Sequence, residues 1–173
     1  MPTSRDPRDR CGIVEAMAEE THRRVSIERI SNSRYTVTND RGGQITIGTG
    51  EGTDFTPVDL LLTAIGGCTA VDVDILTSRR AEPDRFEIEV GAEKVRDRSG
   101  NHLADITVTF RVAFPDGEAG DKARAIVPDA VRQSHERYCT VSRTVETHPA
   151  CRIRCDSSNS HSAEPVVRLE LTT

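Results

Sequence analysis

Five short segments of the chain have the composition or alternation of β-strands. Residues 25–30, 33–39 and 44–50 are β-like, and the turn-forming run NDRGG separates the last two. Residues 86–95 and 105–114 place apolar side chains at every second position. The first group predicts an antiparallel meander. The second group, joined by RDRSGNH, predicts a long hairpin.

An apolar segment with helical spacing lies between these two groups. It follows the loop GEGTDFTPVD, in which Thr56 is a candidate N-cap, Pro57 a first helical residue and Asp59 a carboxylate near the free amides. The helix should run to about Arg80. Its first half is apolar almost all round, so we expect that half to be buried and the last half to emerge into water.

Two adjacent glycines, Gly66 and Gly67, interrupt this apolar helix just before Cys68. An interior glycine costs about 1 kcal/mol relative to alanine, so the pair costs about 2 kcal/mol. We expect the missing side chains to let another backbone approach closely beside Cys68 and narrow a pocket.

The remaining elements complete an α+β pattern. A second helix should begin after Gly120, be kinked or divided at Pro128 and end at Cys139, followed by an interrupted strand over 140–155. Residues 166–173 could form a final edge strand. An antiparallel sheet on one side of two helices fits this order. We assign an N-terminal arm to residues 1–24, one domain to residues 25–155 and a C-terminal tail to residues 156–173.

Composition excludes two classes of partner. The net charge of −5, the 3% aromatic content and the absence of Trp argue against nucleic-acid binding, which needs a basic surface and stacking side chains. Charged residues make up 29% of the chain, and we expect no apolar run near the roughly 20 residues that span a bilayer. The charged N-terminus does not resemble a signal peptide. We therefore expect a cytoplasmic protein that does not enter a membrane.

The five cysteines differ in their surroundings. Cys68 in one helix and Cys139 at the end of another could be an attacking and a resolving thiol if the helices pack together. From periodicity alone, a small buried hydrophobic residue is the favoured interpretation of Cys68. Core filling is expected for Cys151 and Cys155, and Cys11 is expected to be an inconsequential free thiol. A zinc site is only weakly indicated, with the set Cys151, Cys155, His148 and His161.

The paired motifs TPVDLLLTAIGGCTAVDVDIL and ERYCTVSRTV resemble the OsmC/Ohr family of thiol-dependent hydroperoxide reductases, in its OsmC-like branch. The resemblance covers roughly residues 25–155. It implies an intertwined homodimer in which antiparallel sheets wrap two long central helices, with active sites at the subunit interface. It also implies that Cys68 attacks the peroxide, that Cys139 resolves it, and that neither a metal nor an organic cofactor is needed.

One departure from the family concerns a carboxylate that holds an arginine over the attacking cysteine. The family's strong peroxidases carry it directly after the helix-start proline, where this chain has Val58. Asp59 is one residue later, about 100° around the helix, so it cannot simply substitute. Whether Asp59 or Glu51 replaces the carboxylate is left open. The expected arginine is Arg34, with Arg24 and Arg41 as rivals.

These features predict a peroxidase for organic hydroperoxides. Cys68 would become a sulfenic acid, Cys139 would condense with it, and an external dithiol, a lipoyl protein or a thioredoxin-like protein, would reduce the disulfide. The expected substrate-binding residues are Leu61, Leu62, Ile65 and Asp59. The alternative is a non-catalytic or weakly catalytic protein that binds a small apolar or thiol-reactive ligand in the dimer-interface cleft.

Overall fold

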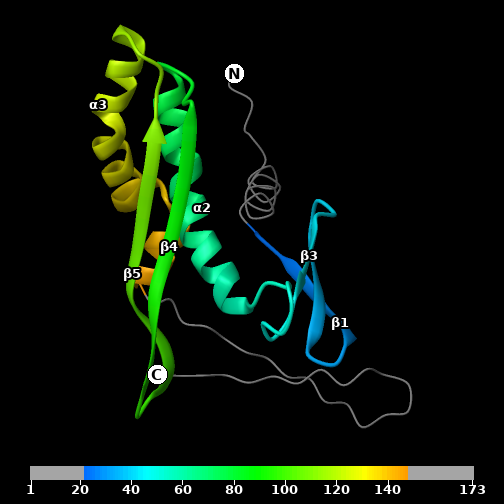
Figure 1. Cartoon of the computed structure of the whole chain (residues 1–173). Helices are drawn as coiled ribbons and strands as arrows, with labels where there is room; N and C mark the ends of the chain where they lie inside the picture. The colour runs from blue at the N-terminus through cyan, green and yellow to red at the C-terminus, as the bar shows by residue number, and fades with distance from the viewer. Residues whose placement is uncertain (1–21, 148–173) are drawn as a thin grey trace, which may run out of the picture. The chain divides into compact units, whose positions relative to one another are not determined.

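The computed structural model describes residues 22–147 and divides at Leu60/Leu61 into two compact units (Figure 1). Its elements are α-helices and antiparallel β-strands, so the expected α+β class is confirmed. Each unit is described by itself.

The first unit contains a three-stranded antiparallel sheet, which confirms the predicted meander. Its order is β1 (Val25–Ser31), β2 (Arg34–Asn39) and β3 (Gln44–Ile47). The turn between β2 and β3 is built on Asn39, whose side-chain oxygen accepts hydrogen bonds from the amides of Arg41 and Gly43. Gly42 lies between them with φ of 83°, a conformation that favours glycine.

One face of this sheet is apolar and open. The register places Ile27 opposite Val37, and Val37 opposite Ile45. Because side chains two apart share a face, Val25 lies on the same side as Ile27. Val25 and Ile27 are each 58% exposed, Val37 and Ile45 are half-buried, and Ile47, two residues after Ile45 on this face, is buried. We call these four residues, Val25, Ile27, Val37 and Ile45, the open apolar face.

Helix α2 (Pro57–Ser78) begins where the sequence predicts. The hydroxyl oxygen of Thr56 accepts a hydrogen bond from the Asp59 amide at 3.1 Å. The Asp59 carboxylate in turn accepts from the amide and the hydroxyl of Thr56, each at 2.8 Å. This reciprocal pattern is a capping box, with aspartate in the position often held by glutamate.

The burial of α2 differs from the prediction. The buried residues include a stripe of period four, Ile65, Thr69, Val73 and Thr77, which extends through the second half. The first half is largely exposed, and Leu61 keeps 41% of its surface open. The expectation of a buried first half and a solvated last half is therefore wrong for the single chain. The second half is buried along this stripe, whereas Val71 and Ile75 on its other side are exposed.

The length of α2 also corrects an expectation. The helix has 22 residues and contains an 18-residue stretch with a mean hydropathy of 1.6, so it is long and apolar enough to cross a membrane by length and composition alone. Core helices of water-soluble proteins meet the same test. Asp72 and Asp74 would be costly at membrane depth, which favours the interpretation as a core helix.

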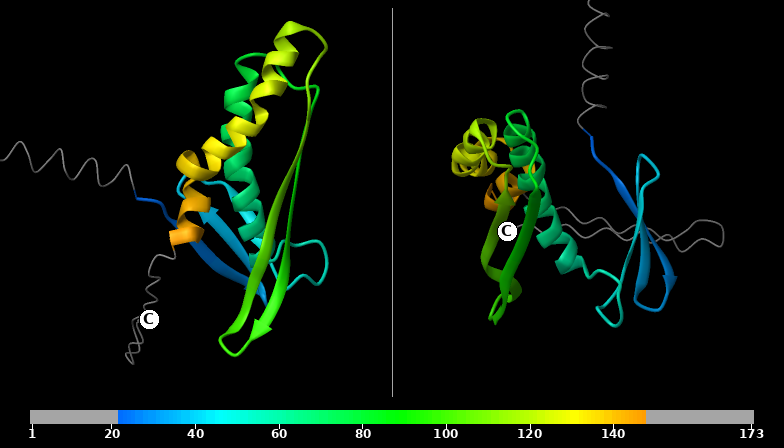
Figure 2. Two further views of the ribbon diagram at one scale, coloured as in Figure 1. Left: turned by 90° about the vertical axis from the view of Figure 1, so that its left-hand side faces the viewer. Right: turned by 45° about the horizontal axis from the view of Figure 1, so that its top comes forward.

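The second unit has a hairpin of β4 (Arg85–Asp97) and β5 (Gly100–Ala113), as predicted. Alternate side chains are half-buried from Phe86 to Ala92 in β4 and from Ala104 to Val112 in β5. The rings of Phe86 and Phe110 meet edge to face, with centroids 6.3 Å apart. Figure 2 shows α2 and α3 side by side against one face of the hairpin.

The two glycines of α2 have different surroundings. A Cβ at Gly66 would overlap Cγ2 of Val90, so its absence lets α2 approach β4 closely. A Cβ at Gly67 would meet nothing within 4 Å. The expectation of another backbone against both glycines is therefore corrected in this chain, because the neighbour of Gly66 is a valine side chain and Gly67 faces open space.

Helix α3 (Glu118–Gln133) begins before Gly120 rather than after it. It continues through Pro128, so the expected division there is wrong. Pro128 leaves the carbonyl of Arg124, an exposed residue, without its helical partner, which water can replace. The buried Ala123 and Ala130 are small enough to permit close packing. The helical path changes later, in a π-helix at Ser134–Tyr138, labelled η1.

The segment after Cys139 is a helix rather than the predicted strand. Helix α4 spans Thr140–Thr147. Its many β-branched residues favour a strand by propensity. Its start is nevertheless fixed by contacts of Cys139, and Ser142 on its inner face is buried. Tertiary packing has therefore overridden propensity.

Several predictions lie outside the described residues. They concern most of the N-terminal arm, the end of the expected interrupted strand, the tail with its edge strand, the thiols of Cys11, Cys151 and Cys155, and the weak zinc site. The assigned domain boundaries stay a prediction.

Candidate active site around two thiols

The structure brings Cys68 and Cys139 together. Cys68 lies in the middle of α2 and is half-buried, whereas Cys139 lies between η1 and α4 and is fully buried. Both are free thiols, and the Cys68 thiol donates a hydrogen bond to the sulfur of Cys139. We call these two residues the thiol pair. The contact meets the basic requirement for a pair that can form a disulfide.

The π-helix η1 positions Cys139. The amide of Cys139 donates to the carbonyl of Ser134 at 2.8 Å, five residues back, which closes the wide turn. The hydroxyl of Ser134, itself fully buried, donates to the Asp72 carboxylate at 2.7 Å. Asp72 is one helical turn beyond Cys68. This bond therefore ties η1 to the turn of α2 next to the first thiol.

Cys139 acts as the N-cap of α4. Its sulfur accepts hydrogen bonds from the amide of Ser142 at 3.3 Å and from its hydroxyl at 3.2 Å. The hydroxyl of Thr69 has a single proton and two acceptors in reach, the Ile65 carbonyl and the Cys139 sulfur. A sulfur that accepts bonds at a helix N-terminus is stabilised as a thiolate.

The two thiols differ in acidity. Burial raises the pKa of Cys139, but the bonds from the side chain and amide of Ser142, with those from Cys68 and Thr69, outweigh it and leave the pKa below the usual thiol value. Burial raises the pKa of Cys68, and only the Val141 amide opposes it. The Cys139 sulfur and the Asp72 carboxylate raise it further. Cys139 is thus the more acidic thiol, and Asp72 opposes ionisation of Cys68 as its position one turn later suggests.

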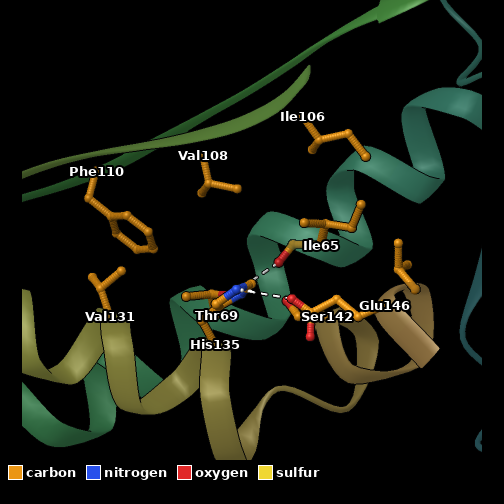
Figure 3. Close-up of a pocket in the computed structure, with 10 residues that line it drawn as sticks. Ile65, Thr69, Ile106, Val108, Phe110, Val131, His135, Ser142 and Glu146 are labelled. Carbon is orange, nitrogen blue, oxygen red and sulfur yellow. Dashed lines mark hydrogen bonds and ion pairs between the residues drawn. The ribbon is translucent and has the colours of Figure 1, made fainter. Parts of the chain in front are cut away.

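An apolar pocket of about 230 Å³ adjoins the thiol pair (Figure 3). Thr69 and Ser142 line it, and these same residues bond to Cys139. Ile106, Val108 and Phe110 of β5 form the opposite wall, as Figure 3 shows. At the polar end, Nε2 of His135 and Oε1 of Glu146 lie 3.1 Å apart. The pocket can accommodate a small apolar group.

Only one of the expected substrate-binding residues lines this pocket. Ile65 does so and is buried. Leu61 is exposed and Leu62 half-buried, and neither is among the lining residues. Asp59 is engaged in the capping box with Thr56, whose amide and hydroxyl keep the pKa of the exposed Asp59 carboxyl below its usual value.

In the first unit, Arg34 has a carboxylate partner that the sequence analysis missed. Its guanidinium donates to both oxygens of Asp54, from Nε at 2.6 Å and from Nη2 at 3.2 Å. This two-point pairing raises the pKa of Arg34 and fixes the plane of the guanidinium. The partner is neither Asp59 nor Glu51, the two candidates from the sequence. The rival Arg24 pairs with Asp40 at 3.2 Å.

Arg34 belongs to the first unit and the thiol pair to the second, so a contact between Arg34 and Cys68 stays a prediction. Among residues 22–147, the side chain of the other rival, Arg41, makes no hydrogen bond or ion pair. Asp54 lies only four residues before Val58, where the family carries its carboxylate. The position of Asp54 in the loop just before α2 was the feature of the sequence that could have identified it as the partner of Arg34.

The sequence analysis also missed Ser142, Thr69 and the His135–Glu146 pair. Ser142 follows Cys139 by three residues, the spacing of an N-cap and its N3 partner. Interpreting residues 140–147 as a strand concealed that signal. Among residues 22–147, the structure has no cluster of three or more His, Cys, Asp or Glu residues that could hold a metal.

The chain belongs to the OsmC-like protein family, because the family model OsmC (OsmC-like protein) matches residues 49–154. No curated protein matches the chain. A hypothetical protein from Aquifex aeolicus is 26% identical, with a TM-score of 0.58, covering 73% of this chain and 88% of that one. An OsmC-like protein from Mycoplasma pneumoniae is 15% identical, with a TM-score of 0.57 and coverages of 73% and 89%.

A further solved structure carries a functional name. It is described as the organic hydroperoxide resistance protein OsmC, a predicted redox protein, from Legionella pneumophila. It is 14% identical to this chain, has a TM-score of 0.50 and covers 72% of this chain and 88% of its own. At this identity the likeness concerns the fold alone.

Proposed function

We propose that the protein is a thiol-dependent peroxidase that reduces organic hydroperoxides. The Cys68 thiolate attacks the terminal oxygen of the peroxide, the O–O bond breaks, and an alcohol leaves after taking up a proton. Cys139 then attacks the sulfenic sulfur of Cys68, forming a disulfide and releasing water. The observation that carries this proposal is the contact of the thiol pair beside an apolar pocket.

Ionisation of Cys68 does not by itself explain a fast reaction. An ordinary thiol with a pKa near 8.5 is only about 3% ionised at pH 7. Lowering the pKa by about 3 units gains roughly 30-fold in thiolate but costs roughly 20-fold in nucleophilicity. The neighbours of Cys68 raise its pKa instead. Rate must therefore come from orienting the peroxide and stabilising charge on the departing oxygen.

We assign that task to Arg34. The two-point pairing with Asp54 supports this role, because a guanidinium with a fixed plane can present its remaining N–H groups to an oxyanion. Asp54 would thus replace the carboxylate that the family carries at the position of Val58. Asp54→Asn should leave the cap of α2 intact and lower kcat, whereas Asp40→Asn, which frees Arg24, should not.

We also propose that the active protein is a homodimer. The open apolar face of the first sheet supports this, as do Leu61, Val71 and Ile75 of α2, which are 41%, 59% and 50% exposed. An apolar patch such as the open apolar face is unusual on the surface of a monomer. A second copy of the chain that covered these apolar side chains would bury residues that the sequence pattern predicts to be buried.

The peroxidase proposal is tested by following cumene hydroperoxide with a reduced dithiol as electron donor. Dihydrolipoamide and a reduced thioredoxin are the two donor classes to compare. Cys68→Ser should abolish peroxide consumption, and Cys139→Ser should stop the cycle after one equivalent. Cys11→Ser is the control and should keep full activity. Wild-type protein without Cys68-dependent consumption would overturn the proposal.

The raised pKa of Cys68 favours a second candidate, a binding protein with little catalytic power. In that case the pocket holds a small apolar ligand and the thiol pair responds to it or lines its surroundings. Binding of an apolar fluorescent probe would then survive Cys139→Ser, and replacement of Val108 in the pocket wall by Asp would abolish it. Turnover at a rate matching that of established peroxidases would exclude this candidate.

A further inference from the structure

The two sulfurs of the thiol pair differ in how easily a reductant can attack them. Cys139 is 0% exposed and lies beneath the first turn of α4, whereas Cys68 is half-buried. Ser142 directs both its amide and its hydroxyl at the sulfur of Cys139. Cys68 has one backbone donor, the Val141 amide, and the Asp72 carboxylate as a neighbouring anion. The Cys139 sulfur is therefore placed to carry negative charge, and the Cys68 sulfur is the one that a reductant can reach.

We propose that Ser142 is a positioning residue that fixes the direction in which the Cys68–Cys139 disulfide is reduced, so that the reductant attacks Cys68 and Cys139 departs as a thiolate. The inference rests on the proposed function, of which it specifies the recycling step. It assigns the mixed disulfide with the reductant to Cys68 alone.

The step balances as a thiol–disulfide exchange. A thiolate of the dithiol attacks Sγ of Cys68, a new S–S bond forms, and the Cys68–Cys139 bond breaks. The electron pair stays on Sγ of Cys139, which accepts the two bonds from Ser142. The second thiolate of the donor then displaces Cys68. The dithiol is oxidised by two electrons to a disulfide, the protein disulfide is reduced, and the two protons of the dithiol pass to the cysteines.

Reduction in the opposite direction, with attack on Cys139 and departure of Cys68, is disfavoured both by access and by the leaving group. Attack on Cys139 requires the reductant to reach a buried sulfur, and it expels Cys68 as a thiolate beside Asp72. Exchange is faster when the leaving thiol is the more acidic one. Access and leaving-group stability therefore favour the same direction.

The position of attack can be read directly by peptide mapping of the full chain. The protein is oxidised with diamide, exposed briefly to glutathione, quenched with iodoacetamide and digested with trypsin. Trypsin places all five cysteines in separate peptides, with Cys68 in residues 42–79 and Cys139 in residues 138–143. We expect glutathione on the first of these and carbamidomethyl on the second. Glutathione on Cys139, or on both equally, would overturn the proposal.

A matched pair of variants on α4 tests the role of Ser142. Ser142→Ala removes the hydroxyl donor and should slow reduction of the disulfide by glutathione about tenfold. Thr144→Ala removes a hydroxyl from an exposed position of the same helix and should change nothing. Ser142→Thr should restore most of the rate. If Ser142→Ala folds normally by circular dichroism and reduces at the wild-type rate, Ser142 has no such role.

This experiment separates the inference from the proposed function. Diamide forms the disulfide without any peroxide, so directional reduction can be observed even if the protein is no peroxidase. A protein that consumes peroxide but carries glutathione on Cys139 would keep the proposed function and lose the inference. If diamide fails to form a Cys68–Cys139 disulfide, the inference is overturned.

Discussion

The two sheets of this protein follow the same sequence rule but differ in what covers their apolar sides. In the β4–β5 hairpin, alternate side chains are half-buried, and helices α2 and α3 lie against one face. In the β1–β3 sheet, Val25 and Ile27 of the open apolar face keep more than half of their surface accessible, and burial on that side is confined to Ile47, next to Ile45. The alternation of apolar and polar residues identifies the face of a sheet that will be buried. It does not identify whether the same chain or a second copy packs against that face.

The largest expected effect concerns the helical cover of the second unit. A Cβ at Gly120 would overlap the carbonyl oxygen of Pro115, a backbone atom that cannot move aside cheaply. Gly120→Ala should lower the free energy of unfolding by about 3 to 5 kcal/mol, measured by urea denaturation. Gly117→Asn is a useful contrast, because φ of 112° at that position implies strain without overlap. An unchanged midpoint for Gly120→Ala would contradict the packing described for the start of α3.

The next prediction asks what covers the first sheet. Ile27→Asp places a charge on the open apolar face and should convert a dimer to monomer, raising the dissociation constant by about 100-fold. Analytical ultracentrifugation measures this directly. Glu28→Gln, on the other face of the same strand, is the control and should leave the mass unchanged. A monomeric wild-type protein would contradict the prediction and show that no second copy packs against the open apolar face.

The adjacent glycines of α2 allow a comparison within a single helix. Gly66→Ala should destabilise the protein by about 1 to 3 kcal/mol, because its Cβ overlaps Val90. Gly67→Ala meets open space and should stabilise it by up to about 1 kcal/mol. Thermal unfolding of both variants gives the signs. A loss of stability at Gly67 would indicate that a second copy lies against this position.

The smallest effect concerns the thiol pair within the second unit. Asp72 raises the pKa of Cys68, so Asp72→Asn should lower it, and Asn can still accept the hydrogen bond from Ser134. The rate of alkylation by iodoacetamide, followed against pH for Cys68, should therefore rise at a lower pH than in the wild-type protein. Because a raised pKa leaves the thiol protonated at neutral pH, wild-type Cys68 should react slowly there. Asp74→Asn, on the exposed side of α2, should not move the profile.

Much of the fold could be predicted because local signals were unambiguous. Thr56, Pro57 and Asp59 form the expected helix start, and the alternation of residues 86–95 matches a strand. The interpretation of residues 140–147 failed because β-branched residues favour a strand, while the helix depends on contacts with Cys139. The predicted division at Pro128 failed because the carbonyl it leaves unpaired belongs to an exposed residue. Propensity carries no information about such distant or solvent-mediated compensation.

The candidate site also divides into features that the sequence indicated and features that only the structure revealed. The sequence singled out Cys68, Cys139 and Arg34, and the resemblance supplied their expected roles. It could not identify Asp54 as the partner of Arg34, since several carboxylates lie close by along the chain and only geometry selects one. Nor could it show that burial raises the pKa of Cys68, whereas at Cys139 the bonds from Ser142 and from the other thiol outweigh burial, because burial and the contact between the thiols depend on how distant helices pack.

The sequence by itself determined the α+β class of the fold, the strand segments marked by alternation and the capped start of α2, and it singled out two thiols to test. Only the tertiary structure decided which face of α2 is buried, which carboxylate pairs with Arg34 and which thiol is the more acidic. The physical reason is range. Periodicity and capping act within a few residues, whereas burial, ion pairing and thiol acidity depend on atoms brought together from distant parts of the chain.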